Sequence, residues 1–195
     1  MVPLALCSVV AVTIIIERFF FFARLRQASR AEEVIGLAGR GCLEEALSMA
    51  GETGGPKRTC LPVMKVLSAG IAHAFEPTGA MEAQASAEIS GMKRGLPALD
   101  TIITLSPLLG LLGTIIGMIN AFNIMAATGL GQPHAVTGGV AEALVCTAAG
   151  ISIAVVTLVF YNYFLSRVEG ETDLIETSAT RLEIALNGAG KGRPS

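Results

Sequence analysis

Three long apolar runs alternate along the chain with stretches in which polar and apolar positions are mixed. In the first run, at the N-terminus, Glu17 and Arg18 are the only charged residues. The second and third runs contain one charged residue each, Asp100 and Glu142. About 20 consecutive apolar residues are enough to cross the ~30 Å hydrocarbon core of a bilayer as a helix. The pattern predicts three transmembrane helices, over residues 1–23, 99–127 and 138–166.

The segment between the first two runs, residues 24–98, has the pattern of amphipathic helices. In "EEVIGLAGRGCLEEALSMAGE" and "CLPVMKVLSAGIAHAF", apolar residues recur at steps of three and four between polar ones. The breaker-rich "GETGGPKR" separates the two stretches. We therefore predict a small helical domain outside the membrane. Residues 128–137 are predicted to form a loop, and residues 167–195 a C-terminal helix and tail.

Basic residues flank one end of every predicted span. Arg24 and Arg26 follow the first span, Lys93 and Arg94 precede the second, and Arg167 follows the third. The positive-inside rule places these ends in the cytoplasm, so the N-terminus and the loop between the second and third spans lie outside. At ~1.5 Å per residue, each later helix would be roughly 40 Å long and would tilt or extend into the cytoplasm.

Composition agrees with a membrane protein and excludes several function classes. Apolar residues make up 52% of the chain and charged residues 15%, and the mean hydropathy is +0.62. A net charge of −2 gives no indication of nucleic-acid binding. The four cysteines are scattered without a C-x-x-C pair, so we expect no disulfide framework, metal site or cofactor. Without paired acids or a nucleophile–base pair, we do not expect an enzyme.

Small residues repeat at helical spacing in the second and third predicted spans. Such residues let helix backbones approach closely, which is how helices associate in lipid. The contact could lie between these two spans or between copies of the chain, and an oligomer is the more economical account for three spans. Pro107 lacks an N–H donor and predicts a kink in the second span. The small residues are Ser106, Gly110, Gly113 and Gly117, followed by Ala143, Thr147, Gly150 and Ala154.

Glu142 is the candidate functional residue, because a charge at the centre of a bilayer costs about 3 kcal/mol or more. It is either a neutral, hydrogen-bonded structural acid or part of a water-filled pathway, and the second reading is favoured. Thr114 and Thr147 add hydroxyls, although such threonines usually bond the carbonyl of their own preceding turn. Thr147 lies ~140° from Glu142 around the helix axis, so both could line one pore only if several helices surround it.

Two motifs resemble one known family when taken together. They are "SPLLGLLGTIIGMINAF" at 106–122 and "GVAEALVCTAAGISIAVVTLVFYNYF" at 139–164. In this order and spacing they resemble the MotA/TolQ/ExbB proton channel family, most closely its ExbB/TolQ branch. The resemblance extends to "IIIERFFFF" in the first span and covers nearly the whole chain. It implies an all-α membrane protein with three spans, a long cytoplasmic segment and a periplasmic N-terminus.

The resemblance also implies a mechanism and partners. Five copies would surround a central pore in the bacterial inner membrane, and the pore would hold the single spans of a dimeric ExbD/TolR-like partner. Protons would pass an aspartate of the partner, with Glu142, Thr114 and Thr147 lining the route. Proton flow would then drive rotation or rearrangement of the ring and energise a TonB-like protein for outer-membrane transport.

Two alternatives remain open beside this ExbB-type interpretation. The chain could serve a TolQ-like system that maintains the cell envelope, or it could be a membrane scaffold whose glutamate is structural.

Overall fold

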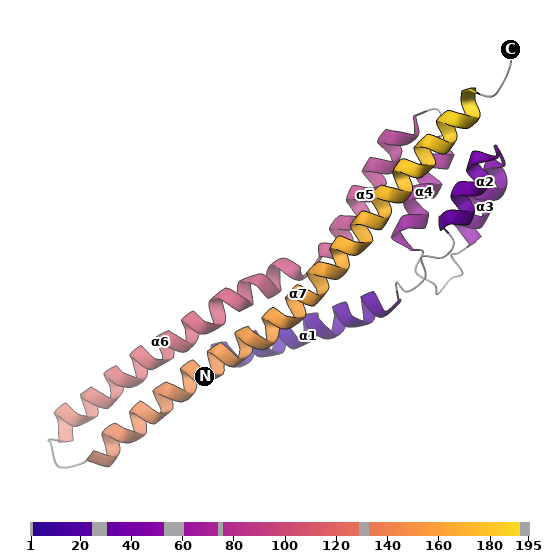
Figure 1. Ribbon diagram of the computed structural model, residues 1–195. Helices are drawn as coiled ribbons and strands as arrows, with labels where there is room; N and C mark the ends of the chain where they lie inside the picture. Colours follow the sequence, from indigo (N-terminus) through magenta and orange to yellow (C-terminus); the bar gives the residue numbers. More distant parts are fainter. Residues whose placement is uncertain (1, 25–30, 53–60, 74–75, 129–132, 192–195) are drawn as a thin grey trace. The chain divides into compact units, whose positions relative to one another are not determined.

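The computed structural model describes residues 2–24, 31–52, 61–73, 76–128 and 133–191, and all secondary structure in these ranges is α-helical (Figure 1). Three helical stretches are long and apolar enough to cross a membrane. The predicted all-α fold with three long apolar helices is therefore confirmed. The helices are α1 (Val2–Arg24), α2 (Ala31–Gly39), α3 (Leu43–Glu52), α4 (Pro62–Ala72), α5 (Pro77–Lys93), α6 (Leu96–Thr128) and α7 (Pro133–Lys191).

The helices belong to two compact units. The first unit contains residues 1–19 and 95–164, and the second contains residues 20–94 and 165–195. The 59-residue helix α7 contributes to both units, because it continues without a break beyond the predicted end of the third span at residue 166.

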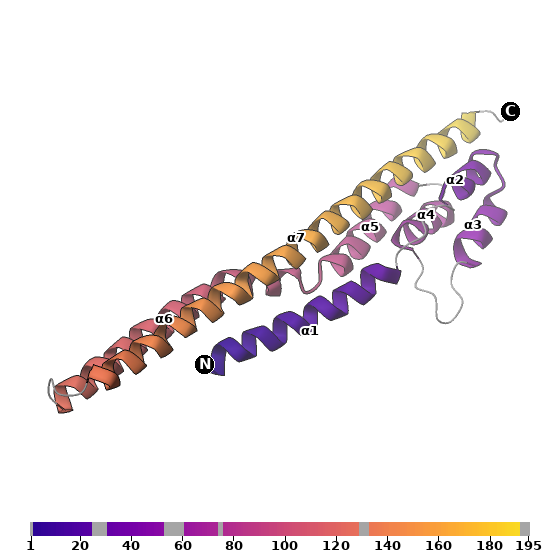
Figure 2. The same cartoon turned by 60° about the horizontal axis from the view of Figure 1, so that its bottom comes forward.

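The first unit consists of most of α1, all of α6 and the first half of α7. In two views α6 and α7 lie side by side (Figures 1 and 2). Leu99 and Phe164 of this unit are fully buried, whereas Leu108, Leu144 and Val159 are more than 60% exposed. Large apolar side chains on the outside of a helical unit are what a lipid environment requires.

A glycine separates α5 from α6. Gly95 has φ +83°, a left-handed conformation that is costly for residues with a Cβ, and it follows the helix end at Arg94. Pro97 then occupies the first turn of α6, where its missing N–H would be unpaired in any case. The local sequence therefore ends one helix and begins the next within three residues.

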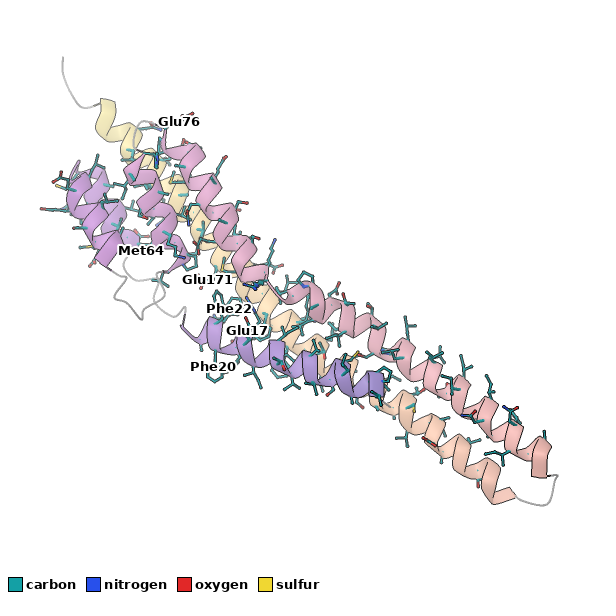
Figure 3. The ribbon with its side chains drawn as sticks, turned by 180° about the vertical axis from the view of Figure 1, so that it is seen from behind. Glu17, Phe20, Phe22, Met64, Glu76 and Glu171 are labelled. Carbon is teal, nitrogen blue, oxygen red and sulfur yellow. The ribbon has the colours of Figure 1, made fainter. Side chains whose placement is uncertain are left out.

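The second unit is a cluster of α2, α3, α4 and α5 with the C-terminal half of α7. Met64 and Leu67 of α4 are buried in its core, and Met64 is labelled in Figure 3. A Cβ on Gly70 would lie 2.6 Å from Met81 Sδ and 3.2 Å from a methyl group of Leu182, so α4, α5 and α7 meet there.

Polar contacts join the same helices. Lys65 Nζ lies 2.9 Å from Glu88 Oε1, and Thr78 Oγ1 donates to Glu183 Oε1 at 3.0 Å. Arg181 of α7 also pairs with Glu32 of α2. The mixed apolar and charged surfaces of this unit contrast with the apolar surface of the first one.

Candidate functional site

The contact between α6 and α7 is built on glycines that face the backbone of the other helix. A Cβ added to Gly110 would lie 3.0 Å from the carbonyl oxygen of Cys146, and one added to Gly150 would lie 2.5 Å from the carbonyl oxygen of Ser106. A larger residue would push the helices apart. The small residues therefore pack two helices of the same chain. The glycines in this contact are Gly110, Gly113 and Gly117 of α6 and Gly139 and Gly150 of α7.

Polar groups without their usual partners lie beside this close approach. Helix α6 continues through Pro107, whose missing N–H removes the usual donor to the carbonyl of Ile103. The neighbouring Ser106 is fully buried, and its Oγ has no hydrogen-bond partner in the part of the chain that the structure describes. The kink expected at Pro107 stays a prediction.

The hydroxyl groups of the two candidate threonines, Thr114 of α6 and Thr147 of α7, donate to neighbouring carbonyl oxygens on one turn of α6. Thr114 Oγ1 donates to the carbonyl oxygen of Leu111 at 2.7 Å, as a threonine within a helix commonly does. Thr147 Oγ1 instead donates across the contact to the carbonyl oxygen of Gly110 at 3.2 Å, so the usual bond to its own helix is not made. Because glycine lets α7 approach so closely, the carbonyl of Gly110 comes within reach. Both hydroxyl oxygens keep lone pairs that can accept a further hydrogen bond.

Glu142 lies in a groove of about 630 Å³ between α6 and α7. Its side chain is exposed, and its carboxylate makes no hydrogen bond or ion pair with any described residue. Asn120 and Asn123 also line the groove, whereas Thr114 and Thr147 do not. The described part of the chain therefore does not provide the hydrogen bonds that a structural, neutral glutamic acid would need.

Glu142 and Thr147 flank the strip of α7 that packs on α6. They are five residues apart, which is ~140° around the axis at ~100° per residue. Residues 143, 146 and 150 contact α6 and occupy the arc between them. In one chain, Glu142 is therefore exposed along one edge of the α6/α7 contact, and Thr147 lies along the other edge.

Other charged residues of the first unit lie outside this groove. Asp100 is exposed on α6. Arg18 is only 4% exposed, and its Nη2 lies 3.1 Å from Glu17 Oε1. Among the described residues, no three His, Cys, Asp or Glu side chains come together as a metal site would require.

Asn120 and Asn123 were missed at the sequence level. They are the only carboxamide side chains between residues 99 and 127, which was the available signal. Their relation to Glu142 depends on how α6 and α7 are aligned.

Comparisons with known proteins agree with these features. A sequence profile of the MotA/TolQ/ExbB proton channel family matches residues 62–177. The biopolymer transport protein ExbB-like 3 of Synechocystis is 36% identical over 191 residues, which cover 94% of this chain and 88% of the relative. An ExbB homolog of Methanothermobacter thermautotrophicus is 33% identical over 158 residues, covering 78% of this chain and 55% of the relative.

A relative from the Tol-Pal system also matches part of the chain. The Tol-Pal system protein TolQ of Pseudomonas aeruginosa is 37% identical over 90 residues, which cover 46% of this chain and 39% of the relative.

Proposed function

Because the chain belongs to the MotA/TolQ/ExbB proton channel family, we propose that it is the ring-forming subunit of an ExbB-type motor in the bacterial inner membrane. Five copies surround the single spans of an ExbD-like dimer, with each N-terminus in the periplasm. Proton flow through this complex energises a TonB-like protein that drives transport across the outer membrane.

The observation that carries this proposal is the exposed carboxylate of Glu142 on an apolar helix, without a partner in the described part of its own chain. A charge is tolerated at such a depth where it meets water or a polar partner. A water-containing pore formed by several copies provides both. This favours a conducting assembly over a scaffold, in which the acid would be hydrogen-bonded within the chain.

A ring also explains why Glu142 and Thr147 occupy different edges of the α6/α7 contact. Each α6/α7 pair in a ring has neighbouring copies on two sides. The glutamate of one copy and the threonines of the next can then border the same pore. In this arrangement Glu142 exchanges a proton with the partner's acid through water, and the hydroxyl oxygens of Thr114 and Thr147 accept hydrogen bonds along the route.

The proton-motive force is large enough to drive such a machine. One proton crossing 100 mV releases about 2.3 kcal/mol. That energy biases a conformational equilibrium ~50-fold, since 1.36 kcal/mol corresponds to a factor of ten.

The test is Glu142→Gln in the chain co-expressed with its single-span partner. We expect proton flux in proteoliposomes to fall at least tenfold, while the ring still co-purifies with its partner. Glu169→Gln is the matched control, because Glu169 is exposed on the same helix outside the predicted span. Undiminished flux in Glu142→Gln would contradict the proposal.

A TolQ-like role is the second candidate, favoured by the match to the TolQ relative. The two roles are separated in cells that lack their own ExbB and TolQ. An ExbB-type subunit restores TonB-dependent uptake, whereas a TolQ-like subunit restores resistance of the envelope to detergent.

A further inference from the structure

The groove at Glu142 is lined by two polar residues, Asn120 and Asn123, to which the proposed proton route gives no role. Its lining includes one carboxylate and two carboxamides, those of Asn120 and Asn123, all of them exposed. The rest of the lining is glycine, alanine, isoleucine and cysteine, and Cys146 is the only other ionisable side chain in it. Three strongly polar side chains therefore share one cavity in an otherwise apolar part of the molecule.

The two asparagines are placed to act together. They are three residues apart on α6, so they lie on one face within a single helical turn. The lining from α7 includes Glu142 and Gly139, and a Cβ on Gly139 would lie 2.9 Å from Ala121 Cβ. Gly139 therefore lets this part of α7 pack closely against α6 beside the groove.

The size of the groove suits water. Liquid water occupies about 30 Å³ per molecule, and a stable site offers each water two to four polar partners. A cavity of about 630 Å³ has room for several waters, and the three polar side chains provide donors and acceptors for them. Apolar contents would leave the carboxylate and both carboxamides without hydrogen bonds, which is costly in a low-dielectric environment.

We propose that Asn120 and Asn123 are positioning residues of the proton path, holding water against the Glu142 carboxyl and stabilising its ionised form. This inference rests on the proposed function. When Glu142 releases its proton, its O–H bond breaks and a new O–H bond forms on a groove water, which becomes hydronium. The carboxylate left behind accepts hydrogen bonds from the carboxamide N–H groups, directly or through water. The carboxamides neither gain nor lose a proton.

Carboxamides suit this task for a physical reason. Hydrogen bonds donated to a carboxylate favour its charged form. A lysine or arginine would do so more strongly, but it would place a second charge at membrane depth, which is energetically costly. Neutral donors stabilise the anion without that cost and without holding the proton themselves.

The experiment uses the complex with its single-span partner in proteoliposomes and removes both carboxamides in Asn120→Leu/Asn123→Leu. We expect at least a tenfold loss of proton flux with unchanged assembly. The infrared C=O stretching band of the Glu142 carboxyl, identified by its loss in Glu142→Gln, is expected to shift in frequency, because hydrogen bonds to this group from the carboxamides and the water they hold are lost. Asn120→Ser/Asn123→Ser keeps a hydroxyl donor at each position and is expected to restore most of both properties.

Asn162→Leu is the matched control, because it removes an exposed carboxamide of α7 outside the groove. It should leave the proton flux and the frequency of the carboxyl band unchanged.

Two results would overturn the inference. One is a double leucine variant with normal flux and an unshifted carboxyl band. The other is loss of partner binding without a shift of the band in the assembled fraction, which would make the asparagines a docking surface for the partner helix. If Glu142→Gln abolishes flux and the asparagine variants do not alter it, only this inference fails. If Glu142→Gln conducts normally, the proposed function fails.

Discussion

The packing of α6 on α7 makes Gly150→Ala the most informative stability test. The added Cβ would lie 2.5 Å from the Ser106 carbonyl oxygen and 3.1 Å from Gly110 Cα, both backbone atoms that no rotamer change can move. Ordinary contact begins at 3.4 Å, so the helices must separate by about 0.9 Å at this point. Overpacking of this kind costs about 1–3 kcal/mol. The separation would also weaken the 3.2 Å bond from Thr147 to Gly110.

Gly138→Ala is the matched control for Gly150→Ala, because a Cβ at Gly138 in the same helix meets nothing within 4 Å. Replacing a helical glycine by alanine stabilises by up to about 1 kcal/mol where space allows. Thermal unfolding followed by circular dichroism in detergent should therefore place Gly150→Ala below the wild type and Gly138→Ala level with it or above. At about 2–4 °C per kcal/mol, the expected loss for Gly150→Ala is roughly 2–12 °C. Equal melting temperatures for the two variants would refute the close approach of α6 and α7.

Three further predictions concern other parts of the chain. Gly95→Ala should lower the free energy of unfolding by about 1–2 kcal/mol in a denaturation experiment, because φ is +83° at this residue. Gly95→Asn should lower it less, and equal stability of both variants and the wild type would contradict this prediction. Burial raises the pKa of the Glu171 carboxyl and nearby Arg167 partly offsets it, so the native state binds this proton more tightly than the unfolded chain. Stability is then lost as the pH rises through the native pKa, and Glu171→Gln should raise the melting temperature near about pH 7 but not near about pH 4. A double-mutant cycle on Lys65→Met and Glu88→Gln should give a coupling energy of about 0.5–1 kcal/mol, because the two groups are close but the Lys65 side chain is 41% exposed to solvent. A coupling energy of zero would show that the 2.9 Å contact adds nothing to the stability.

The three long apolar helices could be predicted because the membrane leaves few alternatives. A chain in lipid must satisfy its backbone hydrogen bonds internally, so a long apolar run with only one or two charged residues predicts a helix. The continuity of α7 beyond residue 166 was harder to predict, because the apolar pattern ends there while the helix does not. Helix ends depend on caps and breakers, and the only glycine between residues 166 and 187 is Gly170, which a helix tolerates.

The candidate site could be predicted only in part, because sequence spacing fixes angles around one helix but not the alignment of two. The ~140° between Glu142 and Thr147 follows from spacing alone. The bond from Thr147 to Gly110 does not, because it requires the close approach of a second helix. The same alignment brings Asn120 and Asn123 into the groove of Glu142. Shifting α7 by one residue would rotate Glu142 by about 100° and separate these groups.

The two edges of the α6/α7 contact differ in their hydrogen-bonding capacity, and this difference favours a ring of several copies. Thr147 has its hydroxyl proton engaged by Gly110 within the chain, so its free capacity is to accept a hydrogen bond. The Glu142 carboxylate makes neither a hydrogen bond nor an ion pair with the described part of the chain. A hydroxyl fixed as an acceptor and a carboxyl free to donate are complementary, but a single α6/α7 pair keeps them on different edges. Copies placed side by side around a pore would bring the two kinds of edge together, and each boundary between copies would then supply both an ionisable group and a fixed acceptor for the passing proton.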